Sequence, residues 1–315
     1  MSNSKSELFG HPKGLFVLFF AEMWERFSFY GMKAILVLFL VSAVDASNSG
    51  FGWTETQALE LFGIYTAMVY IMSIPGGIIA DRLLGQKKSV MIGGLLLVAG
   101  HGLMAYPVEW AFFTALTLIV LGVGMLKPNI STMVGGLYRQ GDPRRDSGFT
   151  IFYMGINIGA FLATVLVSWI GETIGWHYGF GLAGIGMFVG QMVYIWGQPL
   201  LKEVGNFIPS KFTEKGSSQP SKQGLSKVEK DRLGVILVSF IIVIVFWSAF
   251  EQAGGLLTLY AKKYTDRSIG DFTVPASAVH AFNPLFIIIF GSLVAWVWDS
   301  FVRRGKARLP FSKWA

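Results

Sequence analysis

The sequence predicts an all-α membrane protein, and its composition and the arrangement of its charges are the observations that predict it. Hydrophobic residues make up 53% of the 315 positions, charged residues only 14%, and the mean hydropathy is +0.53. A soluble domain carries about 25% charged residues. The apolar residues form long runs, and Lys and Arg stand in short groups between them, as in the loops of membrane proteins. We therefore attribute the net charge of +7 to such loops, and expect a lipid bilayer and no nucleic acid as partner.

Eight apolar runs are long enough to span a bilayer, because a helix needs about 20 residues to cross the hydrocarbon core. Glycine is abundant, at 38 residues, and small residues allow membrane helices to pack closely. The predicted spans are residues 14–41, 57–80, 89–107, 111–137, 148–171, 176–199, 233–261 and 277–302.

The basic residues predict the topology, since cytoplasmic loops are enriched in Lys and Arg. With a cytoplasmic N-terminus, the opposite side of the membrane holds only Lys262, Lys263 and Arg267 outside the spans. One long polar stretch, residues 202–232, separates six spans from two and is typical of a flexible linker. We predict an N-terminal six-helix bundle at 1–199, a cytoplasmic linker at 200–232 and a partial second bundle at 233–315.

The first span contains charges that a lipid-facing helix would not carry. Glu22, Glu25, Arg26, Tyr30 and Lys33 fall on one stripe at 3.6 residues per turn. Each central charge costs about 2.5–3.5 kcal/mol on insertion scales, so these side chains must pair and face protein or water. We expect this helix to line an interior cavity. A purely structural ion-pair cluster is the alternative.

Further polar residues lie in later spans. Lys127 stands near the middle of the fourth span, and Glu251 follows a long apolar run in the seventh. An isolated carboxylate is costly there, so we expect Glu251 to carry a proton; a static bridge to a lysine is the alternative. Tyr70, Asn157 and Asn283 could hydrogen-bond a ligand or merely another helix.

Several function classes are excluded by what the sequence lacks. There is no cysteine, so no disulfide or thiolate metal site can form. The four histidines show no metal-binding spacing, and no Gly-x-x-x-x-Gly-Lys segment is present for nucleotide phosphates. No nucleophile–base pair indicates an enzyme. We therefore expect no metal and no cofactor.

At Glu22-Met-Trp-Glu25-Arg26-Phe27-Ser-Phe-Tyr30-Gly31 the sequence resembles the E-x-x-E-R-F-x-Y-Y-G signature of the proton-dependent oligopeptide transporters (POT/PTR) of the major facilitator superfamily. A second family signature is similar to residues 149–159, and residues 77–88 resemble the loop motif of the superfamily. Residues 246–252 and 283–284 resemble parts of the family's seventh and eighth helices.

This resemblance implies the major facilitator superfamily fold, with an N-terminal six-helix bundle plus the first two helices of the C-terminal bundle. It implies proton-coupled symport of di- and tripeptides by alternating access, in a monomer in the cell (inner) membrane. The resemblance covers helices one to eight of the family and does not match helices nine to twelve. Phe29 and Lys33 stand where the family often has Tyr and Arg, and a lysine offers a point charge instead of a bidentate contact.

The resemblance also implies residue roles by position. Substrate binding falls to Arg26, Tyr30, Lys33, Tyr70, Lys127, Asn157, Glu251 and Asn283. Proton coupling falls to Glu22, Glu25, Arg26, Lys127 and Glu251, and the gating loop to Asp81 and Arg82. Two alternatives stay open: a proton-coupled transporter of another small solute such as nitrate, and a non-transporting membrane scaffold or fragment.

Overall fold

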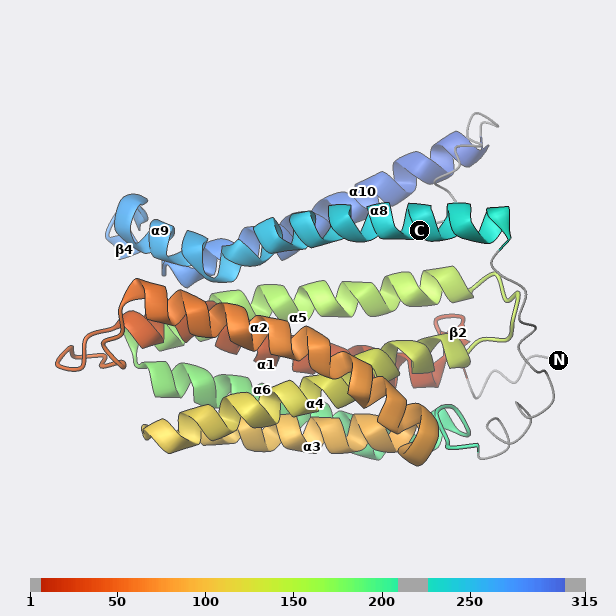
Figure 1. The fold of residues 1–315 in the computed structure, drawn as a ribbon, viewed down its shortest axis with the longest axis horizontal. Coiled ribbons are helices and arrows are strands. Elements are labelled where there is room, and N and C mark those ends of the chain that lie inside the picture. The colour runs from red at the N-terminus through yellow and green to blue at the C-terminus, as the bar shows by residue number, and fades with distance from the viewer. Residues whose placement is uncertain (1–6, 209–225, 304–315) are drawn as a thin grey trace.

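A computed structural model describes residues 7–208 and 226–303. The helices run along the long axis of the molecule, and α8 and α10 are both on one flank (Figure 1). Most of the predicted linker (209–225) and the end of the predicted second bundle (304–315) lie outside the described residues. The division into two bundles therefore stays a prediction.

Long helices form the body of the described chain. They are α1 (Lys13–Val41), α2 (Glu55–Ile79), α3 (Gln86–Met104), α4 (Glu109–Gly136), α5 (Arg145–Thr173), α6 (Trp176–Leu201), α8 (Lys227–Phe250), α9 (Leu256–Tyr264) and α10 (Phe282–Arg303). Short helical turns are η2 (Ala80–Leu84), η4 (Glu251–Gly254) and η5 (Ser277–Ala281). Two small antiparallel hairpins pair β1 (Glu7–Leu8) with β2 (His11–Pro12) and β3 (Ser268–Ile269) with β4 (Phe272–Thr273).

Every predicted span overlaps at least one helix of the structure, which confirms the all-α membrane class. Within the described residues, five helices are long and apolar enough to cross a membrane by length and composition, namely α2 with η2, α4, α5, α6, and α8 with η4. The first helix, α1, is not among them because of its charged side chains, although it is 29 residues long.

The seventh predicted span, 233–261, is wrong as a single helix. It begins earlier, at Lys227, because Ser226 and Glu229 form a capping box in which each side chain binds the other's backbone N–H. It then breaks between α8 and α9. A Cβ atom on Gly254 would lie 2.8 Å from the ring of Phe62 on α2, so this close approach requires glycine.

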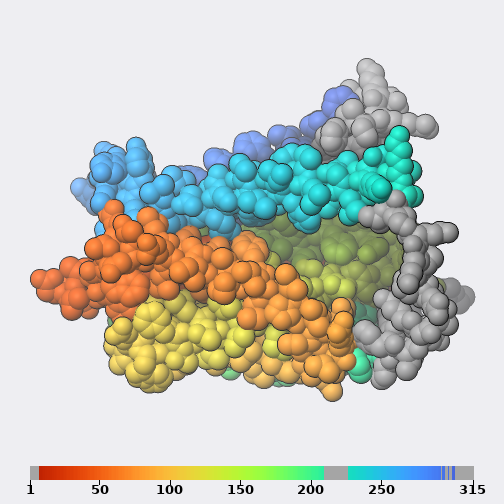
Figure 2. Space-filling model, in the orientation of Figure 1, coloured from red at the N-terminus to blue at the C-terminus, as the bar shows by residue number. Residues whose placement is uncertain are grey.

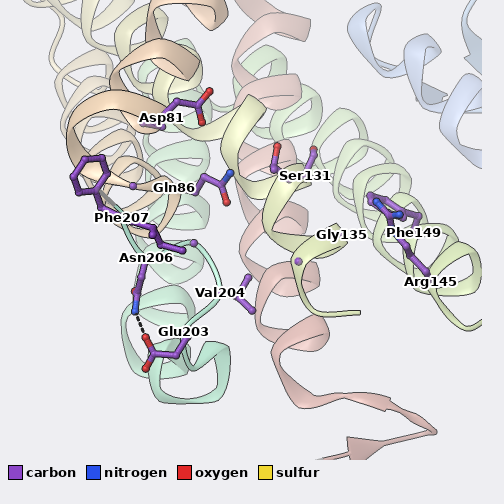
Figure 3. A pocket seen from close by; sticks show the side chains of 16 residues that line it. Asp81, Gln86, Ser131, Gly135, Arg145, Phe149, Glu203, Val204, Asn206 and Phe207 are labelled. Carbon is purple, nitrogen blue, oxygen red and sulfur yellow. Dashed lines mark hydrogen bonds between the residues drawn. The ribbon is translucent and has the colours of Figure 1, made fainter. Parts of the chain in front are cut away.

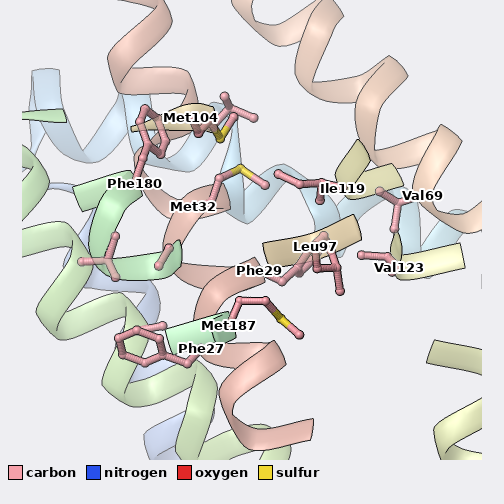
Figure 4. Close-up of a cluster of buried hydrophobic side chains, with 14 of the residues drawn as sticks. Phe27, Phe29, Met32, Val69, Leu97, Met104, Ile119, Val123, Phe180 and Met187 are labelled. Carbon is pink, nitrogen blue, oxygen red and sulfur yellow. The ribbon is translucent and has the colours of Figure 1, made fainter. Parts of the chain in front are cut away.

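Helix α1 lies at the centre of the first six long helices. A Cβ on Gly159 of α5 would lie 2.1 Å from the carbonyl oxygen of Met23, so glycine lets the two helices approach closely. The apolar core around α1 includes Phe27, Phe29 and Met32, which lie among side chains of α3, α4 and α6 (Figure 4). This packing holds the polar stripe of α1 in the interior.

Helix α8 is packed very differently. None of its residues, Lys227–Phe250, is buried. The segments that join this part of the chain to the first six helices are η4, α9, η5 and α10, which contact α1 and α5. In the space-filling view the surface is hollowed between α8 and α2, with α5 at the bottom (Figure 2).

Candidate functional site: a buried charge cluster on α1

The centre of the site is a group of three charged side chains on consecutive turns of α1. Arg26 Nε lies 3.2 Å from Glu22 Oε1, and Arg26 Nη2 donates a hydrogen bond of 2.7 Å to Glu25 Oε1. The three side chains are at most 3% exposed. Removing charges from water is costly unless they pair, and here one guanidinium serves two carboxylates.

One oxygen of this group has no partner. Glu22 Oε2 is buried and accepts no hydrogen bond within the described part of the chain. A buried acceptor without a donor is unfavourable by about 1–3 kcal/mol. A proton on this carboxyl group would remove the excess negative charge of a cluster that has two acids and one base.

A second ion pair joins α1 to the break after α8. Lys33 Nζ binds Glu251 Oε2, and the hydroxyl of Tyr70 on α2 donates to Glu251 Oε1 at 2.9 Å. The side chain of Lys33 is 9% exposed and that of Glu251 is 20% exposed. The structure therefore brings together three predicted site residues from α1, α2 and η4. A proton carrier and a static bridge both fit this geometry.

Aromatic rings surround the cations. Lys127 Nζ lies 4.8 Å from the ring centroid of Tyr70, and Arg26 Cζ lies 5.8 Å from that of Tyr30. A cation over an aromatic face gains about 0.5–2 kcal/mol. Tyr70 thus contacts both Glu251 and Lys127. The sequence analysis missed Phe62, whose ring centroid lies 5.1 Å from Lys33 Nζ; its place on the inner face of α2 follows from helix packing and not from any polar motif.

The expected cavity along α1 stays a prediction. The three charged groups are enclosed by the helices, and neither cavity described below includes them.

The two predicted asparagines lie on α5 and α10. Asn157 is buried on α5, and its Nδ2 donates to the carbonyl oxygen of Tyr153 at 2.9 Å. Asn283, at the start of α10, is exposed and lines a groove of about 420 Å³ with Phe286, Ile287 and Phe290. Their predicted contact with a ligand stays a prediction.

The predicted gating loop forms its own site at the other end of the bundle. Asp81 and Arg82 are exposed on the π-helical turn η2. Asp81 and Gln86 line a cavity of about 840 Å³, with Arg145 on its opposite wall (Figure 3). Glycines at 85, 135, 136 and 205 keep this cavity open by bringing backbone to its surface.

Within residues 7–208 and 226–303, no group of three or more His, Asp or Glu side chains lies close enough to hold a metal ion. The charged groups of α1 instead pair with one another and with Glu251. Such an arrangement can exchange protons and bind a charged solute in place of an internal partner.

Comparison with known proteins shows the family of the chain. The sequence model of the POT family matches residues 87–222 and 217–315. The chain belongs to the POT family. Among curated POT relatives, it is 36% identical to an uncharacterized transporter, YclF, of Bacillus subtilis, with 94% of this chain and 69% of the relative aligned. It is 35% identical to the peptide transporter YePEPT of Yersinia enterocolitica, over 94% of this chain and 69% of that protein. It is also 35% identical to a di-/tripeptide transporter of Lactococcus lactis, over 95% and 71%.

Solved POT structures have the same fold. A crystal structure of peptide transporter POT in complex with sulfate superimposes with a TM-score of 0.78 at 36% identity, covering 95% of this chain and 70% of that one. A POT family transporter in complex with a thioalcohol-conjugated peptide gives a TM-score of 0.78 at 29% identity, covering 94% and 72%. The major facilitator fold predicted from the sequence is thereby confirmed.

Proposed function

We propose that this chain carries di- and tripeptides across a membrane together with protons, by alternating access. The observation that carries the proposal is the ion pair between Lys33 of α1 and Glu251 of η4, which Tyr70 completes. It joins the first six helices to the following segment through groups that can exchange partners. Relatives named as peptide transporters support peptides over nitrate as the substrate.

The residue roles follow from charge complementarity. A short peptide is a zwitterion, so its carboxylate needs a cation, which Arg26, Lys33 or Lys127 supplies. A carboxylate that binds Lys33 competes with Glu251 and releases it to take up a proton. Glu22 and Glu25 share Arg26 and form the second place where a proton neutralises excess negative charge.

The remaining predicted residues line the path. Tyr30 and Tyr70 supply aromatic walls beside the cations. Asn157 and Asn283 bind the peptide backbone or amino end once the helices rearrange. Asp81 and Arg82 belong to the gating loop. We place the N-terminus in the cytoplasm, since Lys and Arg outside the spans gather on that side, and the protein in the cell (inner) membrane as a monomer with two bundles.

The test is Glu251→Gln in proteoliposomes with an inward proton gradient. The amide keeps the shape of the side chain and cannot carry the coupled proton, so uphill dipeptide uptake should be lost while peptide exchange at equal concentrations stays measurable. The matched control is Glu55→Gln, because Glu55 also pairs with a lysine, Lys263, but at the surface. Unchanged uphill uptake by Glu251→Gln at pH 6–7 would show that the proton is carried elsewhere.

A further inference from the structure

The 3-10 helix η5, at the start of the eighth span, is held at its N-terminus by an acid from α5. Glu172 Oε2 accepts from the backbone N–H of Ala276 at 2.9 Å. Glu172 Oε1 accepts from the N–H of Ser277 at 2.9 Å and from its hydroxyl at 2.5 Å. First-turn N–H groups have no partner within their own helix, so this carboxylate fixes η5 on the first group of helices.

At the other end of η5, His280 contacts the segment that follows Glu251. His280 Nε2 lies 2.5 Å from Thr258 Oγ1, and Thr258 Oγ1 lies 3.2 Å from the carbonyl oxygen of Ala253. Thr258 is 0% exposed. No motif of the sequence pointed to either residue.

The available hydrogen atoms determine which group donates in each of these two hydrogen bonds. A threonine hydroxyl has one hydrogen, and the carbonyl oxygen of Ala253 can only accept. For both contacts to be hydrogen bonds, Thr258 donates to Ala253 and His280 Nε2–H donates to Thr258. A histidine with its proton on Nδ1 alone would lose one of the two bonds.

Ala253 lies two residues after Glu251 in the same short turn, η4. The carbonyl group that accepts from Thr258 therefore belongs to the turn that presents the Glu251 carboxylate to Lys33 and Tyr70. The hydrogen bonds connect α5 to η5, η5 to α9, and α9 to η4.

We propose that His280 is a positioning residue, which holds η4 at the angle that Glu251 needs to meet Lys33. Its effect on transport rests on the proposed function, whereas its effect on the Lys33–Glu251 pair does not. A packing role alone would depend on the volume of the side chain, and a positioning role depends on a donor at Nε2.

Two substitutions separate these roles. The amide nitrogen of a glutamine reaches about as far as His Nε2, and that of an asparagine only as far as Nδ1. His280→Gln should therefore keep uphill dipeptide uptake within about twofold of the unsubstituted protein. His280→Asn should lower it about five- to tenfold, the equilibrium factor of one net hydrogen bond. Thr258→Val should match His280→Asn, and the two together should be no worse than either. Equal defects in the glutamine and asparagine variants would overturn the proposal.

A second measurement does not depend on peptides. We expect the shifts in thermal-unfolding midpoint of His280→Asn and Glu251→Gln to be non-additive, because both act on η4. The control is His177→Gln. His177 Nδ1 contacts the carbonyl oxygen of Met104, away from η4, and a glutamine amide does not stand at the Nδ1 position, so the shift of this variant should add to that of Glu251→Gln. Additive shifts for His280→Asn would overturn the proposal. If the unsubstituted protein accumulates no dipeptide, the proposed function fails, and this cycle alone decides the role of His280.

Discussion

Helix α1 and helix α8 reverse the usual relation between polarity and burial. The helix with the most internal charges, α1, is buried along most of its length, with Glu25 at 0% exposure. Helix α8 belongs to the most apolar of the five spans, with a mean hydropathy of 2.8, and none of that span's window is buried inside the protein. In a membrane, apolarity indicates which surface can face lipid, and charge indicates which surface must face protein. The predictions below test how far this contrast extends.

The largest effect on stability is expected from replacing a glycine at a close helix contact, compared with the same replacement at an open position. Gly159→Leu should prevent stable packing of α5 on α1, because the added Cβ alone meets the Met23 carbonyl oxygen at 2.1 Å. Overpacking typically costs 1–3 kcal/mol and more when backbone must move. A Cβ on Gly291 in α10 would meet nothing within 4 Å, so Gly291→Leu serves as the control. The measurement is the yield of monodisperse protein in detergent and its unfolding midpoint; similar losses for both would remove the contrast.

A smaller effect is expected from the two ion pairs that join the regions. Lys33→Ala should destabilise the fold by about 3 kcal/mol, since it leaves the mostly buried Glu251 without its cation. Adding Glu251→Gln should recover part of this loss. Lys263→Ala removes the partner of Glu55 in a pair whose side chains are 48% and 43% exposed, and exposed pairs contribute about 0–1 kcal/mol. Chemical unfolding of the four proteins tests this order, and equal losses from the two lysines would contradict it.

Loss of the hydrogen bonds between Glu172 and the N-terminus of η5 should have an intermediate and local effect on stability. Glu172→Ala removes the acceptor of three hydrogen bonds, and we expect a cost of about 1–3 kcal/mol, as for hydrogen bonds to a charged group. Hydrogen exchange should accelerate at Ala276 and Ser277 and stay unchanged in α3. Uniform acceleration across both regions would show that these hydrogen bonds support the whole fold.

The smallest effect is expected at a surface loop of the first region. Arg144 donates hydrogen bonds to Asp142 from its side chain and from its backbone N–H, and these bonds lower the pKa of Asp142 to about 2. The Arg144 side chain also contacts Glu7 and Gly10. Because the folded pKa is below the unfolded one, the contribution is present above about pH 4 and is lost as pH falls toward 2. Asp142→Asn should slightly reduce the pH dependence of the free energy of unfolding between about pH 4 and pH 2. A change confined to neutral pH would contradict the assignment.

The sequence predicted where the helices lie because each span has its own apolar run and its own flanking charges. It also predicted the polar stripe on α1, since helical periodicity alone places Glu22, Arg26 and Lys33 on one side. The break at Gly254 was not predicted, because two glycines in an apolar run are equally compatible with a continuous helix. The partners of Glu251 were not predictable either, since Lys33 lies 218 residues away along the chain and only packing brings the two together.

The break after α8 has a geometric consequence. With 24 residues and a rise of 1.5 Å per residue, α8 is about 36 Å long, and it ends at the turn that carries Glu251. This turn is the pivot about which α8 can rotate. A rotation of about 5° around this pivot displaces the far end of such a helix by about 3 Å. The Glu251 carboxylate, close to the pivot, moves by only a small fraction of that distance. The hollow between α8 and α2 can therefore widen or narrow at the end far from this turn while Glu251 keeps its contact with Lys33.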